Sequence, residues 1–251
     1  MRYADLIALA VFFAMVWLPL GHQEFMAEHW MKVGTFLAPI VLFYSFREYS
    51  GTRGGVFSNV PLMAGFFAAA YFVHQFEEHW IDLLGRPYPL YNFLNEIIAG
   101  VAGPDKFGVM TPVAIFYINT GAVWATSLLA VATSRSMLFP SMAMAGLMVV
   151  NGVAHIGHAI ATRGYNSGLA TGVVLFLPLG VGFFLALRSD KRVGSGLIAL
   201  ALIWGLVGHV LLFAGLFAAN VYGVIPVTLY YVGLILFGTS ASLLSRLKIT
   251  P

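Results

Sequence analysis

Long apolar runs set the fold of this chain, and the clearest is residues 194–218, GSGLIALALIWGLVGHVLLFAGLFA. The run contains no Asp, Glu, Lys or Arg, and His209 is its one ionisable residue. It is longer than the ~20 residues that a helix needs to cross the hydrocarbon of a bilayer. A run of this length and composition predicts a membrane-spanning helix.

The rest of the chain has a similar composition. Of the 251 residues, 60% are hydrophobic and only 9% are charged, whereas soluble domains are about 25% charged. We therefore expect an all-α, polytopic transmembrane helical bundle that forms a single membrane domain over residues 1–251. The formal net charge of +3 is too small and too dispersed for nucleic-acid binding. The absence of cysteine excludes disulfides and thiolate metal ligands.

Eight apolar segments predict about eight spans. They are residues 4–20, 31–46, 60–84, 110–133, 137–161, 168–187, 194–218 and 224–245. A short interfacial helix is expected near residues 90–100, where tyrosine and phenylalanine can anchor at the headgroups. Lys and Arg are in excess on the side of both termini, so both termini are predicted to be cytoplasmic, in a bacterial inner membrane. All seven histidines then fall in the outer half of the bundle, which predicts one polar site towards the non-cytoplasmic side.

The third predicted span ends in ionisable residues, within YFVHQFEEHWIDLLG, residues 71–85. His74 lies three residues before Glu77 and four before Glu78, so both pairs can meet on one helix face. Two adjacent carboxylates in hydrocarbon need a compensating cation, proton or basic partner, and imidazole with carboxylate suits iron, manganese or zinc. We predict His74, Glu77 and Glu78 as metal ligands, and the two glutamates also as catalytic groups. A solvated pair at the membrane interface is the alternative.

The fifth predicted span supplies further candidates, within NGVAHIGHAIATRGYNSG, residues 151–168. His155 lies four residues after Asn151 and three before His158, so these side chains share a helix face. We predict His155 and His158 as metal ligands, and Asn151 as a cofactor-site residue that fixes an imidazole ring or a bound water. The alternative for either histidine is a hydrogen bond between helices.

Three motifs together resemble the HXXEE domain family of integral membrane proteins. They are HQFEE (74–78), NGVAH (151–155) and YNSG (165–168), in the family's order, with Ser167 where the family has proline. The resemblance covers roughly residues 65–188 and leaves 1–59 and 194–251 as flanking helical hairpins. It implies a membrane-embedded protein and no particular reaction. It supports as functional positions His74, Glu77, Glu78, Asn151, Gly152, His155, Tyr165 and Gly168. From its place in the outer loop, Tyr165 is a candidate catalytic acid or gate.

Two other places carry candidate residues. The segment HQEFMAEHW, residues 22–30, begins and ends like HQFEEHW, residues 74–80. We expect it to form the first outer turn, where Glu28 and His29 would complete a second metal site or cover the first; a solvated turn is the alternative. His209 stands alone in its span and is predicted either to hydrogen-bond between helices or to bind a cofactor, for example as an axial haem ligand.

Three functions fit this pattern. The first is a metal-dependent integral membrane enzyme with a lipophilic substrate: an oxidoreductase with one or two irons, or a hydrolase with zinc. Iron is favoured as the divalent metal because histidines and carboxylates are in surplus. The second is a non-enzymatic cofactor-binding or accessory protein that associates with other membrane subunits. The third, a transporter for metal or protons, ranks last because few ionisable residues continue into the inner half.

Overall fold

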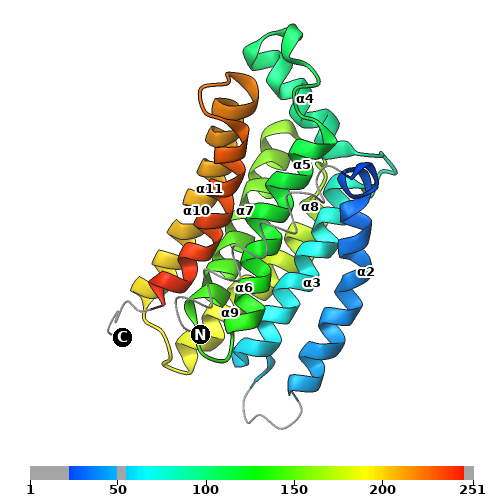
Figure 1. Cartoon of the computed structure of the whole chain (residues 1–251). Helices are drawn as coiled ribbons and strands as arrows, with labels where there is room; N and C mark the ends of the chain where they lie inside the picture. Colours follow the sequence, from blue (N-terminus) through cyan, green and yellow to red (C-terminus); the bar gives the residue numbers. More distant parts are fainter. Residues whose placement is uncertain (1–22, 50–54, 246–251) are drawn as a thin grey trace.

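The protein is a bundle of long helices that run side by side (Figure 1). The computed structural model describes residues 23–49 and 55–245, and these two ranges contain no strand. The predicted span 4–20 lies outside them. The helices are α2 (Glu24–Tyr49), α3 (Val60–His79), α4 (Pro89–Ala102), α5 (Pro112–Asn119), α6 (Ala125–Thr133), α7 (Phe139–Thr162), α8 (Leu169–Thr171), α9 (Leu177–Ser189), α10 (Ser195–Leu216) and α11 (Val227–Leu244). Shorter turns are η1 (Val56–Ser58), η2 (Pro104–Lys106), η3 (Thr120–Trp124), η4 (Gly172–Phe176) and η5 (Phe217–Val221).

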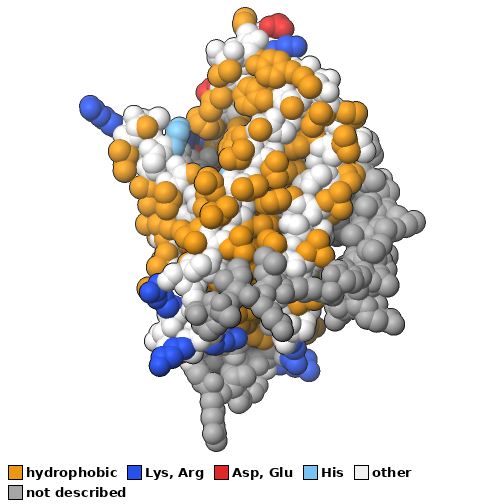
Figure 2. Space-filling model, turned by 90° about the vertical axis from the view of Figure 1, so that its left-hand side faces the viewer, with side chains coloured by type: hydrophobic (Ala, Val, Ile, Leu, Met, Phe, Trp, Pro, Cys, Tyr) orange, Lys and Arg blue, Asp and Glu red, His pale blue; other side chains and the backbone are white. Residues whose placement is uncertain are grey.

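Among the residues that the structure describes, five helical stretches are long and apolar enough to cross a membrane. They are Pro112–Thr133, Phe139–Thr162, Leu169–Ser189, Ser195–Val221 and Val227–Leu244. Hydrophobic side chains cover much of the middle of the face in Figure 2, and charged side chains lie towards its two ends. These findings confirm an all-helical membrane protein, and the five stretches match the last five predicted segments. Eight spans and the orientation of the termini stay predictions.

The N-terminal helices α2 and α3 pack along each other (Figure 1) but carry more polar residues than the five stretches. The segment expected as an outer turn is helical from Glu24 onwards, so α2 begins seven residues before the predicted segment 31–46. Trp30 accounts for the difference, because its side chain is fully buried. Its ring lies 5.0 Å from the ring of His79 and 6.0 Å from that of Trp124. A buried aromatic side chain favours helix here over a solvated turn.

Helix α3 ends at His79 rather than at residue 84, because the chain turns around Asp82. The Asp82 carboxylate accepts hydrogen bonds from the backbone N–H groups of Leu84 and Arg86, both at 2.9 Å. The Arg86 guanidinium lies 2.6 Å from the same carboxylate. Asp82 therefore does not extend the polar face of α3 below Glu78.

This turn predicts a dependence of stability on pH. Burial opposes ionisation of Asp82, but the hydrogen bonds from Arg86 and Leu84 and the guanidinium charge outweigh it and lower the pKa of Asp82 below its ordinary value. A lowered pKa contributes stability that is present above the unfolded value of about 3.9 and lost as the pH falls through the folded value. Asp82→Asn should therefore lower the melting temperature at pH 7, and the difference from the wild type should shrink below about pH 4. A difference that is constant from pH 7 to pH 3 would contradict this.

Small residues bring α7 and α10 close together. A Cβ atom built on Gly146 would lie 2.1 Å from the carbonyl oxygen of Ala201, and one built on Gly205 would lie 2.7 Å from the backbone of Gly146. Only glycine permits so close an approach of two membrane helices. The contact sets one turn of α7 against one turn of α10. It thereby brings Asn151 next to His209.

In the described part of the chain, three single π-helical turns interrupt otherwise continuous helices: η3 between α5 and α6, η4 between α8 and α9, and η5 after α10. Such turns are frequent at functional sites because they shift the side chains that follow. Here η4 ends at Phe176, whose fully buried ring lies 4.3 Å from the ring of His74. The η3 turn contains Trp124, whose indole N–H donates to the side chain of Gln75 at 2.8 Å. Two of the turns therefore support the polar end of α3.

Candidate metal centre

Three predicted ligands converge at one point between α3 and α7. Nε2 of His74 lies 3.3 Å from Oε2 of Glu78, and Nε2 of His155 lies 3.2 Å from Oε1 of Glu78. One ligand atom from each of the three residues lies within 4.8 Å of the other two. Ligand atoms about 2.1 Å from one metal, at near-tetrahedral angles, lie roughly 3.4 Å apart. The spacing of the two histidines and the carboxylate therefore suits a single ion.

The ring of His74 is oriented by Thr171. Nδ1 of His74 lies 2.7 Å from the hydroxyl oxygen of Thr171. That hydroxyl donates its only hydrogen to the carboxylate of Glu77, at 2.5 Å, so it accepts from the Nδ1–H of His74. The neutral ring then carries its lone pair on Nε2, which faces Glu78. Nε2 is buried and has no hydrogen-bond partner among the described residues.

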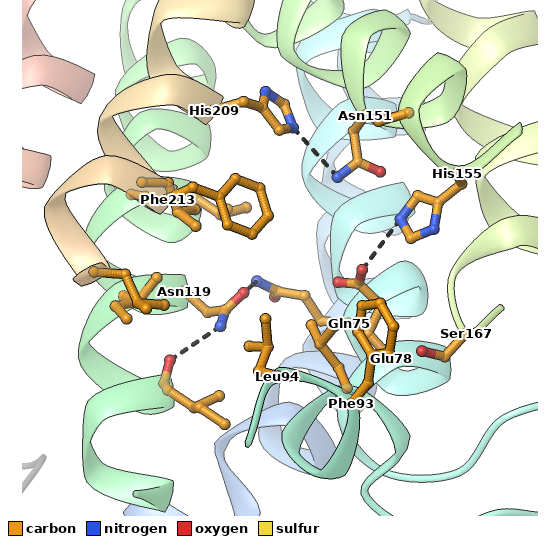
Figure 3. A pocket seen from close by; sticks show the side chains of 18 of the residues that line it. Gln75, Glu78, Phe93, Leu94, Asn119, Asn151, His155, Ser167, His209 and Phe213 are labelled. Carbon is orange, nitrogen blue, oxygen red and sulfur yellow. Dashed lines mark hydrogen bonds and ion pairs between the residues drawn. The ribbon is translucent and has the colours of Figure 1, made fainter. Parts of the chain in front are cut away.

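The ring of His155 is oriented in the same way by Asn166. The amide nitrogen of Asn166 donates to the backbone carbonyl of His155 at 3.0 Å, and this fixes which way the amide points. Its oxygen, 2.6 Å from Nδ1 of His155, accepts the Nδ1–H. The lone pair of His155 is therefore also on Nε2 and faces Glu78, as Figure 3 shows for the ring and the carboxylate.

The residues present thus fit a bound cation. Two imidazole lone pairs and a carboxylate face one another in a buried space, and three acceptors without a shared cation or added protons repel each other. Metal-binding histidines typically donate their other ring N–H to a neighbouring side chain, as both of these do. The charges of Glu78 and of neighbouring Glu77 together balance a divalent metal. The three ligands are two histidines and one carboxylate, a set used for iron(II) and for zinc.

Gly168 closes one side of this centre. A Cβ atom built on it would lie 2.6 Å from Cε1 and 2.8 Å from Nε2 of His155, and 2.8 Å from Cε1 of His74. Its φ of +90° lies in the region that favours glycine. The backbone of the YNSG segment at Gly168 therefore packs directly against both imidazole rings, with no side chain between them.

The other side opens onto a cavity of about 660 Å³. Glu78 and His155 line it, together with Asn151, His209 and mostly apolar side chains of α4, α5, α7, α10 and α11. A volume of this size suits a small organic ligand. Positions on the metal that the protein does not fill would face this cavity.

The structure places Glu77 outside the group of three ligands. Its Oε1 accepts from the Tyr165 hydroxyl at 2.6 Å and from the Ala170 N–H at 3.2 Å, and its Oε2 accepts from the N–H of Thr171 at 2.9 Å. With the Thr171 hydroxyl, Glu77 has four donors. Glu77 therefore ties the YNSG segment and the start of α8 to α3, and through Thr171 it orients His74.

Glu77→Gln is expected to weaken metal binding without abolishing it. A neutral amide cannot accept all four hydrogen bonds, so Thr171 and the ring of His74 lose part of their orientation. Outer partners of this kind change metal affinity by about 10- to 100-fold. The measurement is a competition titration with a chromophoric chelator, and Glu28→Gln, an exposed position on α2, is the control. Complete loss of the metal would show that Glu77 is itself a ligand.

The other predicted site residues lie apart from the three ligands. His158 lines the cavity one turn beyond His155, with its ring 5.1 Å from that of Phe93. In α2, Glu28 is exposed, and the ring of His29 packs against Phe25 at 5.0 Å. Among the described residues, none of His158, Glu28 and His29 belongs to a group of three possible metal ligands.

Asn151 and His209 form a pair at the cavity, with Nδ2 of Asn151 3.5 Å from Nε2 of His209. Tyr165 lies in the loop between α7 and α8. Burial and the hydrogen bond to Glu77 raise the pKa of Tyr165 well above its ordinary value of about 10. At neutral pH Tyr165 is therefore a protonated hydrogen-bond donor to Glu77.

The sequence analysis missed several supporting residues. Thr171 and Asn166 orient the two histidines; the available signal is that Asn166 lies within the YNSG motif and Thr171 lies three residues after it. His79 was left out of the site, yet it is buried and its Nε2 lies 3.8 Å from Glu78. Gln75 is also buried and bonds Trp124.

Comparison with known proteins agrees with the three motifs. Residues 65–183 match the model of a family described as "Protein of unknown function with HXXEE motif". The match confirms the resemblance, and the matched residues include all three candidate ligands, Glu77 and the YNSG segment. No curated protein and no solved structure matches the chain.

Proposed function

We propose that this protein is a metal-dependent integral membrane enzyme, because residues 65–183, which match the HXXEE family model, contain every residue of the candidate metal centre. One divalent metal is held by His74, Glu78 and His155. The observation that carries the proposal is the convergence of two Nε2 lone pairs on one carboxylate at 3.2–3.3 Å. The centre is mononuclear rather than di-iron, because both oxygens of Glu77 are already engaged.

Iron and oxidation are favoured over zinc and hydrolysis. Two histidines and one carboxylate with open positions are typical of non-haem iron(II) enzymes. A zinc hydrolase needs in addition a free carboxylate or histidine as general base. Of the two carboxylates among the described residues that line the cavity, Glu78 is a ligand and Glu96 is exposed, so the base of a hydrolase would be His158 or His209, which line it too. The preference for iron therefore rests on the ligand set. Bound iron(II) would supply the activation of dioxygen, while the chain positions the substrate and excludes water.

The substrate is lipophilic. The cavity wall is mostly apolar, and it includes Phe93 and Leu94 of α4 and Phe213 of α10 (Figure 3). Helix α4 lies at one end of the bundle (Figure 1), where the sequence predicts an interfacial helix. A substrate dissolved in the membrane would enter the cavity at this level.

We further propose eight spans, with both termini in the cytoplasm of a bacterium and the metal centre near the non-cytoplasmic face of the inner membrane. The described basic residues support this orientation. Arg135 lies between α6 and α7, and Arg188, Lys191 and Arg192 lie around the turn between α9 and α10. These turns are at the opposite ends of α7 and α9 from the metal centre, as the positive-inside rule requires.

The test uses full-length protein in lipid nanodiscs, stripped of metal and reloaded with iron(II) or with zinc. We expect dioxygen uptake with iron, a reductant and a membrane lipid extract, and none with zinc or in Glu78→Gln. Release of fatty acid or amine by the zinc form, without dioxygen uptake by the iron form, would establish the hydrolase instead. Neither activity in folded, metal-loaded protein would contradict an enzymatic role.

A further inference from the structure

The cavity has a second polar corner besides the metal centre. Asn151 of α7 and His209 of α10 meet there, and Figure 3 shows both side chains on the same side of the cavity as His155. Asn151 lies one helical turn along α7 from His155. No step assigned to the metal centre uses this corner.

The hydrogen bonds of this corner define what it can bind. Nδ1 of His209 lies 2.8 Å from the carbonyl oxygen of Gly205, so it carries the proton and Nε2 is an acceptor. Nδ2 of Asn151 faces that acceptor at 3.5 Å, and the reverse orientation of the amide would set two acceptors against each other. Oδ1 of Asn151 is therefore the atom left over. It is buried and has no partner among the described residues.

A buried acceptor without a donor costs free energy until a ligand supplies one. The ligand must therefore carry an O–H or N–H group. The charged lining residues do not favour a charged ligand: Glu78 belongs to the metal centre, Arg86 is paired with Asp82, and Glu96 is exposed. An ionised headgroup would thus lack a partner at this depth. The apolar remainder of the wall suits a hydrocarbon chain.

We propose that the cavity binds an uncharged lipophilic alcohol, whose hydroxyl donates to Oδ1 of Asn151 while its hydrocarbon part lies along Phe93, Leu94 and Phe213. The pair formed by Asn151 and His209 selects the hydroxyl and sets how far the chain extends towards the metal. The role of this alcohol as the substrate rests on the proposed function; its binding does not, because neither Asn151 nor His209 is a metal ligand.

The test compares three probes on wild-type protein in nanodiscs. Radiolabelled 1-dodecanol should bind saturably, and unlabelled 1-methoxydodecane, which lacks the donor, should compete at least about tenfold more weakly than 1-dodecanol. Dodecanoate, which is charged, should compete more weakly as well. Equal competition by the ether would overturn the hydrogen bond to Asn151, and tighter binding of dodecanoate would overturn the uncharged class.

Variants separate this inference from the metal proposal. Asn151→Leu should reduce the ratio of alcohol to ether affinity to about one, while its metal content stays that of the wild type. Val153→Leu, at an exposed position two residues along α7, should leave both unchanged. Glu78→Gln should lose the metal yet still discriminate alcohol from ether. If the wild type prefers the alcohol to the ether but binds no metal, only the proposed metal-dependent function is contradicted. If it binds metal but does not prefer the alcohol, only the proposed alcohol site is contradicted. Should Asn151→Leu not fold, the wild-type comparison decides.

Discussion

Glu78→Gln is expected to abolish tight metal binding. Within residues 23–49 and 55–245, Glu78 is the one carboxylate that lies within 3.3 Å of both Nε2 atoms. Glutamine keeps its shape but removes the charge that would hold the cation. We expect metal affinity to fall by more than the ~100-fold that an outer partner can account for. The measurement is the same chelator competition as for Glu77→Gln, so that the two adjacent glutamates are compared directly.

Glu96→Gln is the matched control, because Glu96 lines the same cavity but is exposed on α4. It should bind metal like the wild type. Folding is checked by the melting temperature in the absence of metal. Wild-type affinity in Glu78→Gln, or a larger loss in Glu77→Gln, would mean that the two glutamates have been assigned to the wrong roles.

Gly168→Ala is expected to have the second large effect. The new methyl group would lie within 2.8 Å of atoms of both imidazole rings, so one ring or the loop must move. Alanine at a φ of +90° is itself unfavourable by about 1–2 kcal/mol. Because the rings supply two of the three ligands, we expect a loss of metal affinity comparable with that of Glu78→Gln. The measurement is metal content per folded chain.

Gly108→Ala separates the two effects expected in Gly168→Ala, which are the contact of the new methyl group with the histidine rings and the unfavourable backbone conformation. Gly108 has a φ of +88°, but a Cβ atom there would meet nothing within 4 Å. The control variant should lose stability through its backbone alone and keep its metal. If Gly168→Ala retains the metal, or if Gly108→Ala loses it equally, contact with the histidines is not what matters at position 168.

Much of the fold follows from the sequence because membrane helices are set by local composition. The last five predicted segments match the helical stretches to within a few residues, and the expected interfacial helix is α4. The differences come from tertiary contacts. Helix α2 extends back to Glu24 because Trp30 is buried between other rings, and α3 stops at His79 because Asp82 organises a turn with Arg86.

Spacing and motifs predict His74, Glu78 and His155 as candidate ligands, but they do not predict which of the two glutamates faces the histidines. Glu77 and Glu78 are adjacent, so their side chains point about 100° apart around α3. Spacing alone allows either of them to meet His74. Only the positions of Tyr165 and of α8, which supply the hydrogen-bond donors to Glu77, leave Glu78 to face the histidines. The same packing sets Thr171 against His74 and Asn166 against His155, which the spacing of these residues along the chain does not predict.

The most direct test of the account is the metal content of wild-type protein, purified without chelators and after addition of iron(II) or zinc, by inductively coupled plasma mass spectrometry. The geometry of His74, Glu78 and His155 predicts one metal per chain, with X-ray absorption showing imidazole and carboxylate ligands near 2.1 Å. A folded protein that binds no metal, or one that binds two metals per chain, would contradict the account.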